Sequence, residues 1–227
     1  MNEATVPMDY AAARDHMVDG QVRPNKVIDP RIIRTMRLLP RERFLPAHLA
    51  SLAYADEDVQ LPGGRALMEP MVIARLVQIL RVREGERGLV VACGAGYGAA
   101  LLDACGAQVT ALEDDKALLA VAGRVLPELA PRVALIEGPV TTGWASGGPY
   151  HFILIEGAVG VIPDALGAQL VPGGRLVAVV MQPGEPGKAV LAEAVQVGGE
   201  SRMRAQPVFD CATPLLPQFR PAPAFTF

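Results

Sequence analysis

From Arg87 onward the chain alternates short, wholly apolar runs with stretches of helical periodicity. The runs GLVVAC, AQVTALE, RVALIEG, FILIEG and GGRLVAVVM show no in-and-out alternation of apolar and polar residues. Strands that are apolar throughout are covered on both faces, as in a parallel sheet. The strand–helix–strand–helix order therefore predicts an α/β fold, with a doubly wound, mostly parallel sheet and helices on both of its faces.

The residues before this region are predicted to be mainly helical. The segment IDPRIIRTMRLLP predicts a helix with Asp29 as N-cap and Pro30 in its first turn. A second amphipathic helix, EPMVIARLVQILRV, begins at Pro70. Between the two helices we expect a loop that contains the turn residues LPGG.

The C-terminal part departs from the alternating pattern. KAVLAEAVQV and SRMRAQPVFD, separated by Gly198 and Gly199, predict two antiparallel strands that close one edge of the sheet. The proline-rich tail that follows is expected to be extended. Two alternatives remain open for it: Phe219, Phe225 and Phe227 pin the tail to the body, or the tail is a solvated end.

The composition excludes several classes of protein. Hydrophobic residues make up 51% of the chain and charged residues 20%, a balance unlike that of disordered chains. A net charge of −3 does not favour nucleic-acid binding, and neither a signal peptide nor a membrane span is visible. The three cysteines, Cys93, Cys105 and Cys211, are too few and too scattered for a disulfide framework. We therefore expect a cytoplasmic protein that binds neither nucleic acid nor a membrane.

A glycine-rich turn lies between the first buried run and the helix after it. The sequence CGAGYG places Gly94, Gly96 and Gly98 where a ligand can approach backbone N–H groups at a helix N-terminus. Glu113 ends the next run, where a carboxylate can accept both hydroxyls of a ribose. Together they predict a nucleotide-like ligand. The alternative is that the glycines only relieve crowding between strand and helix.

The spacing of the glycines does not identify the nucleotide. A dinucleotide fingerprint has G-x-G-x-x-G, and Ala99 stands at the sixth position, which that pattern tolerates in its variant form. NAD is therefore not excluded by spacing. No Tyr-x-x-x-Lys follows the turn, however, which argues against a nicotinamide dehydrogenase.

Several motifs in order resemble the protein-L-isoaspartate O-methyltransferase family of enzymes that use S-adenosyl-L-methionine (AdoMet). VIDPRIIRTMRLLPRERFLP and AYADEDVQL resemble the opening segments of that family, and GAGYGAALL resembles its G-x-G-Y-x-A-A-x-L. GPYHFILIEGAVGVIPDALGAQLVPGGRLVAVV resembles its later P-Y-D-x-I, I-P-x-x-L and G-G-R-L-V series. The likeness covers most of residues 10–180.

The resemblance implies a Rossmann-like methyltransferase fold with a seven-stranded sheet and AdoMet as cofactor. It implies methyl transfer to an isoaspartyl carboxylate of a damaged protein or peptide; a homodimer is compatible with the sequence. An ionised carboxylate needs no general base, so catalysis reduces to positioning and to replacing water around it. We expect one domain (1–227) composed of a helical substrate-side part (1–84), an AdoMet-binding core (85–182) and C-terminal strands with a tail (183–227).

The resemblance also implies the site residues. The backbone at the glycine turn is expected at the methionine end of the cofactor, Glu113 on the ribose, and the segment from Leu67 to Pro70 at the substrate mouth. Glu156 is a candidate substitute for an acid that the family places earlier, or alternatively a solvated strand-end acid. The expected cofactor residues are Cys93, Gly94, Ala95, Gly96, Glu113, Gly138 and Glu156, and the expected catalytic residues are Met68 and Glu69.

Four positions depart from the family pattern. Val90 replaces an acid, Ala92 replaces a glycine, Pro139 replaces an aspartate, and Met68 replaces a hydroxyl-bearing residue. A Cβ at position 92 is unfavourable by about 1 kcal/mol or more if the site needs a positive φ. Two alternatives to the enzyme of the family therefore stand: a catalytically impaired scaffold that binds a partner, and a methyltransferase with a different acceptor.

The remaining polar and aromatic candidates each have two interpretations. Arg41, Arg43 and Arg65 either clamp a carboxylate or lie on a solvated face. Trp144 either stacks on adenine or covers a loop. Cys93 is expected to be a packed thiol. The three histidines are expected to be structural: His16, His48 and His151.

Overall fold

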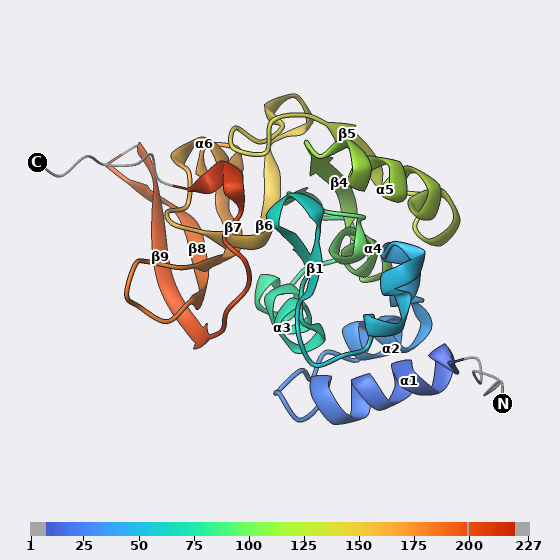
Figure 1. Cartoon of the computed structure of the whole chain (residues 1–227). Coiled ribbons are helices and arrows are strands. Elements are labelled where there is room, and N and C mark those ends of the chain that lie inside the picture. The colour runs from blue at the N-terminus through green and yellow to red at the C-terminus, as the bar shows by residue number, and fades with distance from the viewer. Residues whose placement is uncertain (1–7, 199, 221–227) are drawn as a thin grey trace, which may run out of the picture.

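The computed structural model describes residues 8–198 and 200–220, with the side chain of Glu200 excepted. Its centre is a sheet in the order β5-β4-β3-β6-β7-β8-β9 (Figure 1). The pairs from β5 to β7 are parallel, and β8 and β9 are antiparallel, so the predicted doubly wound sheet with two closing strands is confirmed. The strands are β3 (Arg87–Val91), β4 (Gln108–Glu113), β5 (Ala134–Glu137), β6 (Tyr150–Val159), β7 (Leu170–Val180), β8 (Lys188–Val197) and β9 (Glu200–Asp210).

The two faces of the sheet are covered unequally. The side of the sheet that carries Val90 and Phe152 packs against the N-terminal helices and against α4 and α5. The other side, with Leu89 and Ile153, packs against the short α6 and the C-terminal tail. The helices are α1 (Tyr10–Met17), α2 (Pro30–Leu38), α3 (Pro70–Leu80), α4 (Tyr97–Ala104), α5 (Lys116–Leu129) and α6 (Asp164–Gly167). The shorter helical turns are η1 (Val18–Val22), η2 (Arg41–Phe44), η3 (Ala47–Leu52), η4 (Pro62–Gly64), η5 (Ala145–Gly147) and η6 (Pro217–Phe219).

The helices of the N-terminal part begin where the sequence predicts. Asp29 accepts a hydrogen bond from the Arg31 N–H at 2.9 Å and caps α2, with Pro30 as its first residue. Pro70 likewise opens α3. Among the described residues, none of the helices has both the length and the apolar character that crossing a bilayer requires.

A small hairpin differs from the loop expected around LPGG. Strands β1 (Val59–Leu61) and β2 (Arg65–Leu67) pair antiparallel across Gly63 and Gly64, which both have positive φ. They form a two-stranded sheet separate from the main one. The hairpin lies over the carboxyl end of β4 beside η6 (Figure 1). The two segments are in contact, since a Cβ on Gly64 would lie 3.0 Å from Pro217.

The described part of the tail is attached to the sheet and is extended as far as Leu216, after which the helical turn η6 departs from the expected extended form. Leu216 is buried and donates its N–H to the Ala158 carbonyl at 2.9 Å. Phe219 packs against the same side of the sheet as Leu216. This arrangement agrees with the pinned alternative as far as Arg220; Phe225 and Phe227 lie outside the described residues.

The Gly88→Ala variant is expected to unfold with a free energy about 1–3 kcal/mol lower than wild type. Gly88 pairs with Phe152 across β3 and β6, and a Cβ there would lie 2.0 Å from the buried Phe152 ring. Urea denaturation measures the difference. The control is Gly123→Ala in α5, where nothing lies within 4 Å of the added Cβ and a gain of up to ~1 kcal/mol is expected. Equal stability of Gly88→Ala and wild type would contradict the packing described.

Candidate active site

The glycine turn joins β3 to α4 at the carboxyl edge of the sheet. Ala92, Gly94 and Gly96 have φ values of 56°, 58° and 94°. Ala92 therefore adopts the left-handed backbone that a glycine at this position in the family pattern would favour. For a residue with a Cβ, this conformation is unfavourable by about 1 kcal/mol. A Cβ on Gly96 would lie 2.9 Å from Leu126, and one on Gly98 would lie 2.3 Å from Glu156 Oε1. Crowding thus explains Gly96 and Gly98, whereas nothing lies within 4 Å of a Cβ on Gly94.

Glu113 ends β4 beside this turn, as predicted, and its carboxylate is buried. Its Oε2 accepts the Gly94 N–H at 2.7 Å, and its Oε1 accepts the N–H groups of Asp114 and Asp115 at 2.9 and 3.0 Å. Burial raises the pKa of the Glu113 carboxyl, while Arg65 and these N–H groups act in the opposite direction. The turn and the strand-end acid therefore form one hydrogen-bonded unit.

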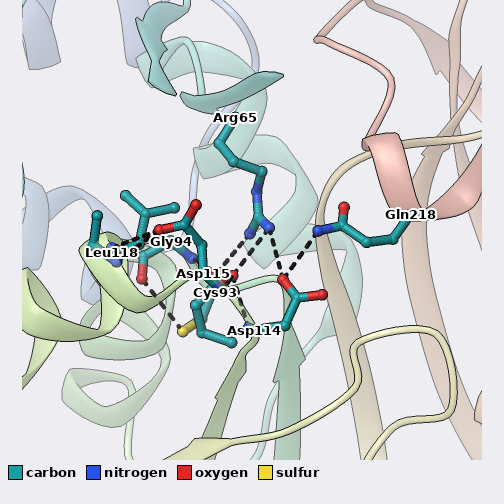
Figure 2. A network of polar contacts seen from close by, with 9 residues as sticks. Arg65, Cys93, Gly94, Asp114, Asp115, Leu118 and Gln218 are labelled. Carbon is teal, nitrogen blue, oxygen red and sulfur yellow. Dashed lines mark hydrogen bonds and ion pairs between the residues drawn. The ribbon is translucent and has the colours of Figure 1, made fainter. Parts of the chain in front are cut away.

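Arg65 completes this unit from the hairpin. Its Nη2 and Nη1 donate to Glu113 Oε2 and Oε1 at 2.6 and 3.0 Å. Figure 2 shows the side chains of Arg65 and Gln218 directed toward Asp114 from two different sides. The distances to Asp114 Oδ1 are 3.5 Å from Arg65 Nη1 and 3.0 Å from Gln218 Nε2. The solvated expectation for Arg65 is wrong, because Arg65 is 3% exposed; the carboxylate that it clamps bidentately is that of Glu113.

Arg41 is a second buried arginine that the sequence did not place. Its Nε donates to the Ala53 carbonyl at 2.7 Å, its Nη2 donates to the Met68 carbonyl, and its guanidinium lies 4.7 Å from the centre of the Tyr97 ring. Burial lowers the pKa of Arg41. The solvated interpretation is again wrong, because Arg41 is buried and links the Ala53 and Met68 carbonyls to Tyr97 of α4, whereas a carboxylate clamp at Arg41 stays a prediction. Arg43, by contrast, lies on the surface and pairs with Glu128 at 2.6 Å.

Glu156 projects into the space between the glycine turn and the buried arginines. Burial raises its pKa to about 8, against the lowering effects of Arg65, Arg41 and the Gly98 backbone hydrogen bond. Its Oε1 has no hydrogen-bond partner, and neither does the hydroxyl of Tyr97 or the Nη1 of Arg41. The solvated interpretation of Glu156 is therefore wrong, since the side chain is buried in a partly unsatisfied polar cluster.

The predicted substrate mouth is built from a packed residue and an acidic group. Met68 is buried in the main core. Glu69 is partly exposed, and its N–H donates to Asp58 Oδ1 at 2.7 Å. Burial raises the pKa of the Glu69 carboxyl, and Asp56 and Asp58 raise it further. Negative charge is therefore concentrated at this end of α3.

The adenine side of the predicted site lies beyond β5. Gly138 donates its N–H to the Glu113 carbonyl at 3.0 Å, and a Cβ on Gly138 would lie 3.8 Å from the Trp144 ring. Trp144 therefore lies beside the expected adenine position. Cys93 is buried within the turn, and burial raises the pKa of its thiol well above the ordinary value, which agrees with a packed thiol rather than a nucleophile.

The backbone and carboxylate groups at this edge of the sheet fit an adenosyl ligand, although Arg65 is bound to the carboxylate that the ribose would use. Gly94, Glu113 and Gly138 follow three adjacent strands at their carboxyl ends, next to the switch point between β3 and β6 where open α/β sheets bind ligands. The Glu113 carboxylate, however, is engaged by Arg65.

Comparison with known sequences finds relatives of one enzyme family. The family model for protein-L-isoaspartate(D-aspartate) O-methyltransferase matches residues 12–205. A protein-L-isoaspartate O-methyltransferase of Methylorubrum extorquens is 39% identical over 78% of this chain and 77% of its own. A protein-L-isoaspartate O-methyltransferase of Methylorubrum populi is 36% identical over 83% of this chain and 88% of its own.

Comparison with solved structures supports the fold. A protein-L-isoaspartate O-methyltransferase structure aligns with a TM-score of 0.73 at 20% identity, over 90% of this chain and 65% of that one. A Plasmodium falciparum structure described as the same enzyme in complex with S-adenosyl-L-homocysteine aligns with a TM-score of 0.70 at 18% identity, over 90% and 98%. From the extent of the sequence match, this chain belongs to the protein-L-isoaspartate(D-aspartate) O-methyltransferase family.

Proposed function

We propose that this protein is an AdoMet-dependent methyltransferase that methylates the side-chain carboxylate of isoaspartyl residues in damaged proteins. Family membership supports the reaction class and the cofactor. One observation supports the residue assignments: the Gly94 turn, Glu113 and Gly138 lie along one edge of the sheet and are joined by hydrogen bonds. The non-catalytic alternative is not favoured by these comparisons.

The proposed roles follow from the positions of the side chains. Glu113 accepts the ribose hydroxyls, the backbone of Gly94, Ala95 and Gly96 faces the methionine end, and Gly138 with Trp144 borders adenine. When bound, AdoMet supplies an electrophilic methyl group on a positively charged sulfur. The chain then has to orient the substrate carboxylate and exclude water, because an ionised carboxylate is already a nucleophile.

Glu156 is proposed to face the cationic end of the cofactor in place of the acid that Val90 replaces. Its pKa of about 8 means that the carboxyl is largely protonated at neutral pH in the described conformation. A nearby cation lowers the pKa of a carboxyl. Glu156 therefore gives up its proton when a cation binds, and an uncharged Glu156 does not repel an approaching carboxylate beforehand.

The proposed function predicts transfer of labelled methyl from AdoMet to an isoaspartyl peptide and none to the same peptide with normal aspartate. The label should be lost on mild base treatment, because a methyl ester is formed. Glu113→Ala is expected to abolish the transfer, since the ribose position loses its carboxylate. Transfer by wild type to neither peptide, under conditions in which S-adenosyl-L-homocysteine binds, would contradict the proposed substrate.

A methyltransferase with a different acceptor is a second candidate, and one observation favours it. Met68 offers no hydroxyl, and Glu69 lies beside Asp56 and Asp58, so the substrate mouth disfavours an anionic group. Labelled AdoMet supplied with cell extract discriminates the two candidates. Methyl incorporation into extract, with none into isoaspartyl peptide, would favour the second.

We also propose that the protein works in the cytoplasm, where cysteines remain reduced. Cys93, Cys105 and Cys211 are all free, and burial raises the pKa of each thiol. The high apolar content of the sequence permits a homodimer but does not require one. Sedimentation of the purified protein tests for a homodimer, and a monomer at all concentrations would exclude one.

A further inference from the structure

The Glu113 carboxylate has no capacity left for a ribose. An ionised carboxylate offers about four lone-pair sites. Five hydrogen bonds reach the two oxygens of Glu113: two from the Arg65 guanidinium and one each from the N–H groups of Gly94, Asp114 and Asp115. The two ribose hydroxyls can replace the two Arg65 donors, which keeps the total at five, but they cannot be added to them.

The donor that can be replaced is Arg65. The three N–H groups belong to the glycine turn and to the residues directly after β4, so they are fixed by the main sheet. Arg65 comes instead from the hairpin of β1 and β2, which is not part of that sheet. Two three-residue strands are marginally stable by themselves. Val59, Leu61 and Leu67 of the hairpin are nevertheless buried in the main core, so release of Arg65 requires a local opening of this contact while the main sheet keeps its structure.

Burial strengthens the contact and closes the position to solvent. Glu113 is 0% and Arg65 3% exposed, and the bidentate geometry is the strong form of this ion pair. Gln218 of the tail donates to Asp114 and covers the same place from the other side (Figure 2). A neighbouring cavity of about 710 Å³ includes Gln218 in its wall, but neither Glu113 nor Arg65 lines it.

We infer that Arg65 gates the cofactor site of this enzyme: its ion pair with Glu113 keeps the ribose position closed, and the adenosyl ligand binds the form in which the hairpin has withdrawn Arg65. The inference rests on the proposed function, because it concerns the same site. Cation and ligand compete for one carboxylate. The apparent affinity for an adenosyl ligand is therefore lower than that of the open form by the fraction of molecules that are open.

The test is a calorimetric titration of the full chain with S-adenosyl-L-homocysteine. Arg65→Ala removes the competing cation. If the closed form of wild type outnumbers the open form by about ten to one, the variant binds S-adenosyl-L-homocysteine about tenfold more tightly than wild type. Arg175→Ala is the matched control. It also breaks an ion pair, the partly buried one with Glu86 at 2.6 Å, but next to the amino end of β3, and its affinity should equal that of wild type.

The outcomes separate this inference from the proposed function. Binding by wild type with equal or weaker binding by Arg65→Ala would overturn the gate and leave the function in place. Absence of binding by both folded proteins would overturn both. Arg65→Gln, which removes the charge and keeps only a neutral amide group, provides the same comparison should the alanine variant fail to fold.

Hydrogen exchange supplies a readout that a purely structural role of Arg65 would not produce. In wild type, saturating S-adenosyl-L-homocysteine is expected to increase amide exchange in residues 59–67 while it protects the glycine turn. Protection of residues 59–67 on binding would contradict withdrawal of the hairpin.

Discussion

Replacing Glu113 with glutamine is expected to lower the free energy of unfolding by about 3–5 kcal/mol. The substitution keeps the shape of the side chain but leaves the Arg65 guanidinium, 3% exposed, without its bidentate partner. Asp114 lies 3.5 Å from Arg65 Nη1 and, being partly exposed, offsets only part of this loss. Guanidinium chloride denaturation measures the change.

A double variant tests whether the unpaired charge is the cause. Glu113→Gln combined with Arg65→Ala removes both charges and should recover much of the lost stability, because burying a lone ion is the unfavourable part. Glu86→Gln is the matched single control: its partner Arg175 is 14% exposed and can turn toward solvent, so a smaller loss is expected. A double variant as unstable as the sum of the two single variants would argue against coupling.

Replacing Glu156 with glutamine is expected to stabilise the protein at high pH by about 3–5 kcal/mol and to have little effect at acidic pH. The pKa of the Glu156 carboxyl is raised from 4.5 to about 8 in the folded state. Between these values the folded state holds a proton that the unfolded state has released, so the stability of wild type falls as pH rises through this window. Glutamine resembles the protonated acid and does not titrate.

Unfolding free energies of wild type and Glu156→Gln, measured from pH 4 to 9, check this expectation. The difference between them should grow from near pH 4.5 and level off above about pH 8. Glu128→Gln is the control, because it removes the same group from an exposed pair with Arg43 and should change stability by less than about 1 kcal/mol throughout. A difference that does not vary with pH would show that Glu156 is not a buried protonated acid.

Elements with a local signal were predicted from sequence. The wholly apolar runs identify the inner strands because burial on both faces removes alternation. Asp29 and Pro30 identify the start of α2 by capping chemistry. Glu113 was placed correctly because a strand end and a glycine turn are both local features that a parallel sheet brings together at one edge.

The hairpin and its arginine were not predicted. A signal for the hairpin exists in VQLPGGRAL, where apolar residues alternate on either side of two glycines, but each strand has only three residues. Arg65 lies 48 positions before Glu113, and nothing local distinguishes it from a solvated arginine. The burial of Arg41 escaped prediction for the same reason: its partners are carbonyl groups, which every residue has.

The cover over the strand ends consists of two segments that are synthesised far apart in time. Residues 59–67 leave the ribosome before any strand of the main sheet, whereas residues 214–220 follow all of them. Arg65 is therefore available as soon as β4 forms, while Gln218 reaches Asp114 only when translation of the described chain is nearly finished. A nascent chain would thus have its buried ion pair in place before the tail shields it.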